Sequence, residues 1–234
     1  MKKNMKIAID GTGSSGKGTL AKKAAAQLSF SYIDTGAIYR SVAYLSRRAG
    51  ISWEDGEQVA QLAQSLSVEF IFEQSRFEIK VNDEVLTNEL RQEDIGQGAS
   101  IVSSHPSVRA ALVEIQRSAA DLMDKKQGGV LMDGRDIGSV ILPEADLKIY
   151  VDAQSTVRAK RRFNQLIDGH DAPSLTYEDV LSDLMERDLR DKTRSTAPLV
   201  QCSDAVLLDT TDLTIEQSVQ QIVDWVQGHE AFEG

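Results

Sequence analysis

A glycine- and serine-rich run followed by a lysine lies near the start of the chain, directly after the apolar residues 7–9. The spacing of Gly11, four residues and then Gly16-Lys17 lets successive backbone N–H groups curl around an anion, and Lys17 adds a full positive charge. This pattern predicts a binding loop for the phosphates of a nucleoside triphosphate. Its residues are Gly11, Thr12, Gly13, Ser14, Ser15, Gly16, Lys17, Gly18 and Thr19.

The end of the loop departs from the common form of this motif. The common form has Ser or Thr directly after the lysine, where the hydroxyl ligates Mg²⁺. In this chain Gly18 intervenes and Thr19 carries the hydroxyl. The resulting GKGT ending is found in many nucleoside monophosphate kinases, so the loop favours that subclass.

Charged residues at helical spacing form a second group of candidates. Two sets each share one helix face: Arg158, Arg161 and Arg162, and Arg187, Asp191 and Arg194. Such charge is typical of a solvated, salt-bridged helix pair, and equally of a site for a second anion. The spacing alone leaves both interpretations open.

Five short apolar runs must position these residues, and each run ends in aspartate. The runs end at Asp10, Asp34, Asp133, Asp152 and Asp209. Continuous Val/Ile/Leu runs separated by helical stretches are typical of buried parallel strands. They predict an open α/β sheet with its ligands at the carboxyl ends of the strands, where most of the aspartates would be helix caps or turn formers.

Residues 67–86 break this pattern. Hydrophobic residues alternate with polar ones there, and Gln74-Ser75 and Asn82-Asp83 are typical turns. We expect a small antiparallel hairpin or three-stranded sheet within an insertion at about residues 62–91.

Helices are expected at about 92–103 and 106–126, and after Asp152. Gly169 to Ser174 predicts a break before a helix that Thr176 caps with Asp179. A last helix follows Thr214, with Gln217 completing a capping box.

The composition of the 234-residue chain limits its functions. A net charge of −10 argues against binding to a nucleic acid backbone. Cys202 is the only cysteine and the three histidines are scattered, so neither a disulfide framework nor a metal site is expected. Because no run of residues approaches transmembrane length, the sequence predicts a cytoplasmic protein without a membrane partner.

Several segments in order along nearly the whole chain resemble bacterial cytidylate kinases. They are GTGSSGKGT, DTGAIYR from Asp34, HPSVRAAL from His105, MDGRDIG from Met132 and ERDLRDKTRSTAPL from Glu186. The loop alone is common to many ATPases, whereas DTGAIYR and DGRD together with an Arg/Asp helix are far more specific. Thr12 stands where the family usually has proline, which restores a backbone N–H without removing a phosphate donor.

The resemblance implies transfer of a phosphoryl group from ATP to CMP or dCMP, with Mg²⁺, in pyrimidine nucleotide metabolism. It implies a three-layer P-loop kinase fold of class α/β, with a five-stranded parallel sheet, a small antiparallel insertion and a short helical lid. Residues 1–36 and 127–234 would form the core, with the lid at about 155–194. Residues 37–126 would form the monophosphate-binding region. We expect a monomer whose Mg²⁺ is held mainly by phosphates and water.

The resemblance also assigns site residues. The cytosine contacts fall on Ser100, Arg109 and Asp136. The acceptor phosphate and sugar contacts, together with a hydroxyl at the monophosphate site, fall on Thr35, Arg40, Arg135, Arg187, Asp191 and Arg194. Lys17 and Arg135 would act on the transferred phosphoryl group together with the lid cations Arg158 and Arg162.

Two other classes remain open on the residues alone. A kinase that phosphorylates a hydroxyl group would need a carboxylate base, for which Asp34 or Asp133 could serve. A nucleotide-dependent switch that reads guanine would need an N-K-x-D or T-K-x-D motif, and neither string occurs. The number of arginines suited to a second phosphate favours a monophosphate kinase over both.

Overall fold

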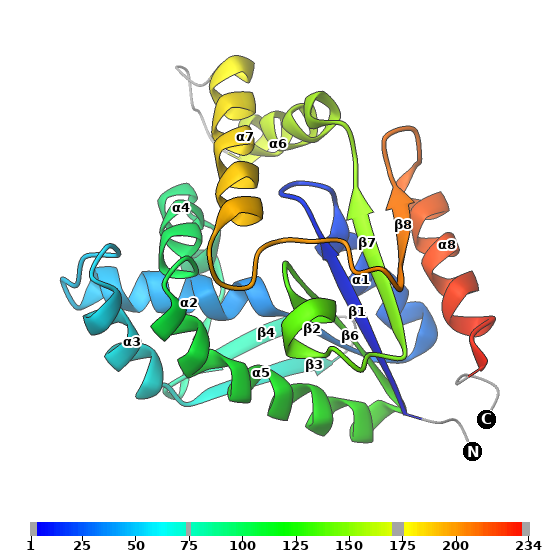
Figure 1. Ribbon diagram of the computed structural model, residues 1–234, viewed down its shortest axis with the longest axis horizontal. Helices are drawn as coiled ribbons and strands as arrows, with labels where there is room; N and C mark the ends of the chain where they lie inside the picture. Colours follow the sequence, from blue (N-terminus) through cyan, green and yellow to red (C-terminus); the bar gives the residue numbers. More distant parts are fainter. Residues whose placement is uncertain (1–3, 74–75, 170–175, 231–234) are drawn as a thin grey trace.

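The computed structural model describes residues 4–73, 76–169 and 176–230. The apolar runs form one five-stranded parallel sheet in the order β2-β6-β1-β7-β8 (Figure 1). Its strands are β1 (Met5–Gly11), β2 (Ser31–Asp34), β6 (Gly129–Gly134), β7 (Leu147–Asp152) and β8 (Ala205–Asp209). The predicted parallel sheet is confirmed, and the carboxyl ends of all five strands lie at one edge.

Helices cover both faces of this sheet and complete an α/β sandwich. They are α1 (Lys17–Leu28), α5 (Pro106–Gln127) and α8 (Ile215–Gln227), while α2 (Thr35–Arg48) leads away from the end of β2. α1 packs on α8, and α5 packs on β2 and β6. The capping box of Thr214 and Gln217 at the start of α8 is confirmed. No helix among the described residues is long and apolar enough to cross a membrane.

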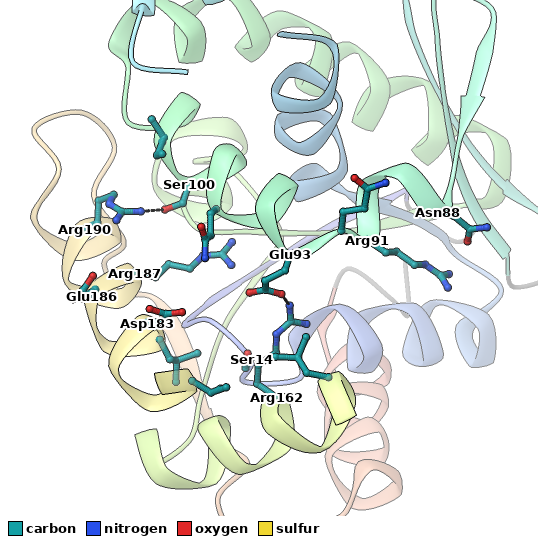
Figure 2. Close-up of a pocket in the computed structure, with 16 residues that line it drawn as sticks. Ser14, Asn88, Arg91, Glu93, Ser100, Arg162, Asp183, Glu186, Arg187 and Arg190 are labelled. Carbon is teal, nitrogen blue, oxygen red and sulfur yellow. Dashed lines mark hydrogen bonds and ion pairs between the residues drawn. The ribbon is translucent and has the colours of Figure 1, made fainter. Parts of the chain in front are cut away.

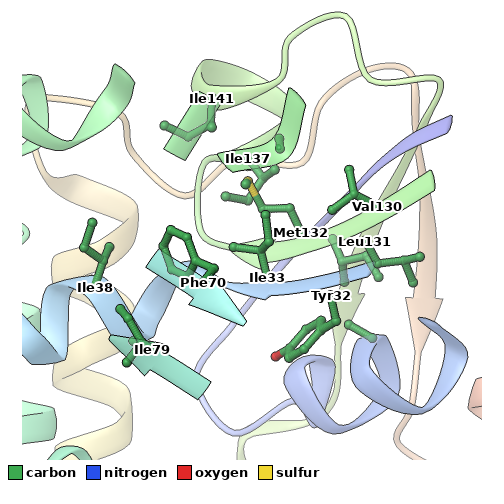
Figure 3. Close-up of a cluster of buried hydrophobic side chains, with 14 of the residues drawn as sticks. Tyr32, Ile33, Ile38, Phe70, Ile79, Val130, Leu131, Met132, Ile137 and Ile141 are labelled. Atoms are coloured by element: carbon green, nitrogen blue, oxygen red, sulfur yellow. The ribbon is translucent and has the colours of Figure 1, made fainter. Parts of the chain in front are cut away.

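A second sheet interrupts this pattern as expected. β3 (Val68–Glu73), β4 (Arg76–Val81) and β5 (Glu84–Leu86) are antiparallel in that order. The turn at Asn82-Asp83 is confirmed, with φ of +48° and +67°, whereas Gln74-Ser75 lies outside the described residues. Tyr32 of β2 packs edge-on against Phe72 at 5.9 Å between ring centroids, so this sheet shares the core of the larger one (Figure 3).

Further helices pack on α2 and α5. They are α3 (Gly56–Gln64), the short 3₁₀ turn η1 (Asn88–Arg91) and α4 (Glu93–Val102). α4 and α5 match the predicted helices, whereas the residues of α2 and α3 were not recognised as helical. α2 begins directly where β2 ends, because Asp34 caps it by accepting a hydrogen bond from the N–H of Ala37 at 3.2 Å.

Two helices project beyond the carboxyl edge of the central sheet (Figure 1). They are α6 (Ser155–Gly169) and α7 (Tyr177–Thr193), and we refer to them as the lid helices. The predicted capping box of Thr176 and Asp179 at the start of α7 is confirmed. The predicted break at residues 169–174 lies outside the described residues, except for Gly169, which ends α6.

Candidate active site

The glycine-rich loop connects β1 to α1 at the carboxyl edge of the sheet. Ser14 and Gly16 have a left-handed backbone, with φ of +57° and +89°. A Cβ atom on Gly11 would lie 2.0 Å from the carbonyl oxygen of Val151, so only glycine fits there. Gly16 is the N-cap of α1 and supplies no side-chain cap, which leaves the first N–H groups of the helix available to an anion.

Lys17 begins α1, and its side chain folds back over the loop. Its Nζ atom donates to the carbonyl oxygen of Thr12 at 3.2 Å, and the side chain is buried. Burial and the neighbouring guanidinium of Arg135 lower the pKa of Lys17 from its ordinary value. A phosphate bound between the two cations would reverse this shift, because an anion stabilises both charged forms.

Hydrogen bonds from the ends of neighbouring strands hold the loop in place. Thr12 Oγ1 donates to Asp152 Oδ1 at 2.6 Å, and Thr210 Oγ1 donates to the carbonyl oxygen of Ser15 at 3.2 Å. Asp152 ends β7, and Thr210 directly follows β8. The loop is therefore fixed by side chains as well as by its own turns.

A buried ion pair from the lid helices also contacts the loop. Arg158 of α6 donates from Nη1 to Asp188 Oδ2 of α7 at 2.6 Å and to the carbonyl oxygen of Gly13 at 2.9 Å. Asp188 Oδ1 in turn accepts a hydrogen bond from the N–H of Gly13 at 3.1 Å. The structure thus places Arg158 beside the loop, already paired with a carboxylate.

A cavity of about 270 Å³ opens between the loop, the ends of β2 and β6, and α2, α4, α5 and α7. All the acceptor-site residues expected from the sequence line it, together with Lys17. They are Thr35, Arg40, Ser100, Arg109, Arg135, Asp136, Arg187, Asp191 and Arg194. These residues, which lie up to 177 positions apart in the sequence, from Lys17 to Arg194, therefore meet in one place.

One end of this cavity holds a buried carboxylate and two guanidinium groups. Asp136 and Arg109 form an ion pair in which each residue is 4% exposed. Arg109 also donates to the carbonyl oxygen of Ser103 at 3.2 Å and lies 5.4 Å from the centre of the Tyr39 ring. Arg194 Nη2 approaches Asp136 Oδ1 at 3.9 Å. This end therefore offers a fixed pattern of one acceptor group and several donors.

The other end of the cavity is rich in positive charge. Arg40 pairs with Asp34 at 2.6 Å, and Arg135 pairs with Asp191 at 2.9 Å. Arg187 lies near both pairs, and its Nε atom is buried without a hydrogen-bond partner. Burial and Arg135 lower the pKa of Arg187 to about 10. Such a group needs an anion to satisfy it, so this end is suited to a phosphate.

A larger cleft of about 1100 Å³ adjoins this cavity and the loop (Figure 2). η1 and α4 form one side of it, and the lid helices form the other. Arg162 of α6 forms an ion pair with Glu93 of α4, and Arg190 Nη1 of α7 donates to Ser100 Oγ of α4 at 2.8 Å (Figure 2). These contacts connect the two sides of the cleft, and they pair Arg162 with a carboxylate on the side formed by η1 and α4.

Asp10 fixes the segment that carries Asp136. It accepts hydrogen bonds from the N–H groups of Ile137 at 2.8 Å and Gly138 at 2.7 Å. Burial raises the pKa of Asp10 to about 6. Asp10 therefore has a structural task at the sheet edge, which agrees with the expectation that most strand-end aspartates are caps or turn formers.

The description "Cytidylate kinase" belongs to the family model that matches residues 7–228 of this chain. The chain belongs to the cytidylate kinase family. The cytidylate kinase of Neisseria meningitidis serogroup C is 45% identical over 225 residues, which cover 96% of this chain and 98% of the relative. The cytidylate kinase of Chromobacterium violaceum is 43% identical, with 96% of each chain covered.

Solved structures show a similar fold at low identity. An uncharacterized protein from Eubacterium ventriosum has a TM-score of 0.50 and 11% identity, with 96% of this chain and 99% of that chain covered. This likeness concerns the arrangement of helices and strands alone. The assignment of this chain to the cytidylate kinase family therefore depends on the sequence matches and on the motif segments quoted above.

Several polar residues of this cytidylate kinase site were missed by reasoning from the sequence. Tyr39 and Ser103 line the smaller cavity, and Glu93 and Arg190 line the cleft. Asp188 contacts the loop itself. Three of them carried a signal in the sequence: Asp188 and Arg190 stand beside Arg187 and Asp191 in the segment ERDLRD, and Tyr39 stands beside Arg40 in DTGAIYR.

Proposed function

We propose that this protein transfers the γ-phosphoryl group of ATP to CMP or dCMP, giving ADP and CDP or dCDP. The observation that carries the proposal is a single cavity. It is lined by Lys17 of the triphosphate loop, by the three arginines Arg40, Arg135 and Arg187, and by the buried pair of Arg109 and Asp136. Membership of the cytidylate kinase family supports the same activity. The alternative of a solvated helix pair receives no support, because Asp191 is buried and Arg187 faces the cavity.

The base would bind at the Asp136 end of the cavity. Cytosine offers an N4 amine donor beside the acceptors N3 and O2, so Asp136 would accept from N4 while Arg109 donates to the ring acceptors. Uracil has O4 and N3–H in place of the first two groups. It would leave buried groups unpaired at a cost of about 1–3 kcal/mol per mismatch, or roughly 5- to 150-fold in kcat/KM. We therefore expect CMP and dCMP to be preferred over UMP.

The acceptor phosphate would bind among Arg40, Arg135 and Arg187, with Lys17 on the phosphoryl group that moves. Its oxygen is already ionised at neutral pH, so the reaction needs no general base. It needs two polyanions held in line and cations around the transferred group, whose transition state spreads charge over three oxygens. The unpartnered Nε of Arg187 fits this task, since it lacks a hydrogen-bond acceptor in the free protein.

Mg²⁺ would accompany ATP. The hydroxyl that usually follows the loop lysine is absent, and Thr19 is exposed. The described residues contain no group of three acidic, histidine or cysteine side chains that could hold a metal. Asp133 is the carboxylate beside Gly18, since a Cβ atom there would lie 3.5 Å from Asp133 Oδ2. We propose that phosphates, water and Asp133 hold the ion, which neutralises phosphate charge when bound.

The lid helices would exclude water from the reaction. An exposed γ-phosphate would be open to hydrolysis, and closing the cleft over it prevents that side reaction. Arg162 would turn from Glu93 to the transferred phosphoryl group when ATP is bound, while Arg158 already lies at Gly13.

We also propose that the enzyme works as a monomer in the cytoplasm. Size-exclusion chromatography with light scattering would measure the molar mass in solution and so test whether the protein is a monomer.

A coupled assay of ADP release against a panel of nucleoside monophosphates and small hydroxyl compounds tests the activity. We expect turnover with CMP and dCMP, and little with UMP or AMP. Turnover of a hydroxyl compound alone would instead support a hydroxyl kinase with Asp34 or Asp133 as base. ATP binding without acceptor-dependent turnover would indicate a binding module.

A further inference from the structure

We propose that Asp188 and Arg158 form a positioning pair that couples the acceptor site to the triphosphate loop through helix α7. This inference rests on the proposed function, because it concerns how the two substrate sites of that reaction communicate. The pair lies between the two substrate sites, so it can transmit a change at one site to the other.

The pair holds both polar groups of one loop residue. The N–H of Gly13 donates to Asp188, and the carbonyl oxygen of Gly13 accepts from Arg158. Arg158 Nε also donates to the carbonyl oxygen of Ala153 at 2.8 Å, which ties it to the end of β7. Arg158 and Asp188 are 5% and 7% exposed. A buried charge pair with this many hydrogen bonds fixes geometry, whereas its net stabilisation is small.

Helix α7 leaves room for little more than a methyl group beside the same loop residue. A Cβ atom on Gly13 would lie 3.4 Å from Leu184 Cδ1 and 3.4 Å from Asp188 Oδ1. Leu184 and Asp188 are four residues apart and so lie on one face of the helix. A shift of α7 would therefore move directly against the loop.

The next turn of α7 reaches the acceptor site. Asp191 accepts a hydrogen bond from Arg135 Nε at 2.9 Å, and its Oδ1 lies 4.0 Å from Arg194 Nη1. Arg194 in turn approaches Asp136, on which the base would bind. Two sets of hydrogen bonds and ion pairs therefore lie one turn apart on α7: Asp188 belongs to the set at the loop, and Asp191 belongs to the set that reaches Asp136 through Arg194.

This arrangement gives α7 two sites that can bias its position. An acceptor that binds Arg187, Asp191 and Arg194 favours one placement of the helix, and Asp188 carries that placement to Gly13. By thermodynamic linkage, a triphosphate in the loop must then favour the acceptor by the same factor. The pair would act on the coupling between the substrates more than on the affinity for either substrate alone.

Calorimetric titration of a non-hydrolysable ATP analogue, with and without saturating CMP, measures this coupling without turnover. We expect saturating CMP to lower the Kd of the ATP analogue by at least about fivefold in the wild-type protein, which is within the usual range of allosteric coupling. Asp188→Asn should reduce the factor to less than about twofold, because the amide cannot bind Arg158 and Gly13 in the same way. Glu178→Gln makes the same chemical change at an exposed position of α7 and should keep the full factor.

Two further measurements guard against loss of folding. The double variant Arg158→Met with Asp188→Leu leaves no unpaired buried charge, and it should show the same loss of coupling. In the wild-type protein, CMP alone should slow hydrogen exchange in peptides covering residues 12–16. Absence of coupling in the wild type, full coupling in Asp188→Asn or the double variant, or unchanged exchange on adding CMP would each overturn the proposal. CMP that does not bind at all would instead contradict the proposed function.

Discussion

Replacing Asp136 by asparagine changes one atom of the buried carboxylate and should alter the choice of base. The carboxylate can only accept, whereas the side-chain amide of asparagine offers one acceptor and one donor group. The variant would lose a charge-assisted hydrogen bond to the N4 amine of cytosine. It would gain a donor that can face O4 of uracil.

The size of the effect follows from the burial of the pair. Asp136 is 4% exposed, so water cannot replace the lost interaction. A hydrogen bond to a charged group is worth about 1.5–3 kcal/mol, which corresponds to a fall of about 10- to 150-fold in kcat/KM for CMP. For UMP we expect no fall. The preference for CMP should therefore narrow by at least about tenfold.

The cavity should keep its shape in this variant. Arg109 retains the carbonyl oxygen of Ser103 and the ring of Tyr39, and Arg194 Nε retains the carbonyl oxygen of Ala197 at 2.7 Å. Asp94→Asn is a matched control, because it breaks an Arg–Asp pair of the same chemistry with Arg47 at an exposed position. That control should leave the base preference unchanged.

The assay is coupled ADP release with CMP and with UMP, each over a full range of concentration. Thermal unfolding of both variants separates a loss of base contact from a loss of fold. An unchanged ratio of kcat/KM for CMP and UMP in Asp136→Asn would refute the assignment of Asp136 to the base. This includes a fall in kcat/KM by the same factor for both acceptors, which would indicate a general role of Asp136.

Three other predictions concern charge at the sheet edge. Lys17→Ala and Arg135→Ala should each lower kcat by about 100-fold or more in the same assay, because each removes a cation at the transferred group; near wild-type rates would contradict that role. Burial and Arg135 lower the pKa of Lys17, so ATP binding at about pH 8 should take up protons, measurable by calorimetry in buffers of different ionisation enthalpy and reduced in Lys17→Met. Burial raises the pKa of Asp10 from 3.8 to about 6, so as the pH falls the folded state binds this proton before the unfolded state does. Above pH 6 the buried charge of Asp10 lowers the free energy of unfolding by about 3 kcal/mol, and this loss disappears as the pH falls toward 4. The free energy of unfolding of the wild type should therefore rise relative to Asp10→Asn over that range, and parallel pH profiles would show that the shift is absent.

The central sheet could be predicted because its information is local. Each strand contains a short apolar run followed by an aspartate, which is the last or the next-to-last residue of the strand. The turn at Asn82-Asp83 and the capping boxes that begin at Thr176 and Thr214 could be predicted for the same reason, because each depends on residues close together in the sequence. α2 was missed because its capping residue, Asp34, is also the last residue of a strand, so a single aspartate closes one element and begins the next.

The resemblance to cytidylate kinases predicted which residues line the acceptor cavity. It could not predict the hydrogen-bond and ion-pair partners of each of these residues. Nothing in the spacing of Arg158 indicates that it binds Asp188 on another helix, or that Arg162 pairs with Glu93, 69 residues away. These pairs depend on how the lid helices pack over the sheet edge, which is a property of the tertiary structure. The division of roles among the arginines likewise stays a prediction.

The unpartnered Nε of Arg187 has a consequence for engineering. Burial, and after it the neighbouring cation Arg135, lower the pKa of Arg187, so the free protein keeps a buried charge beside a like charge at a cost to its own stability. Replacing Arg187 by methionine should yield a protein that resists heat better and no longer works, a common trade between stability and activity. Selection of variants for heat resistance alone would therefore favour the loss of this arginine, and any such selection needs a parallel measure of phosphate binding.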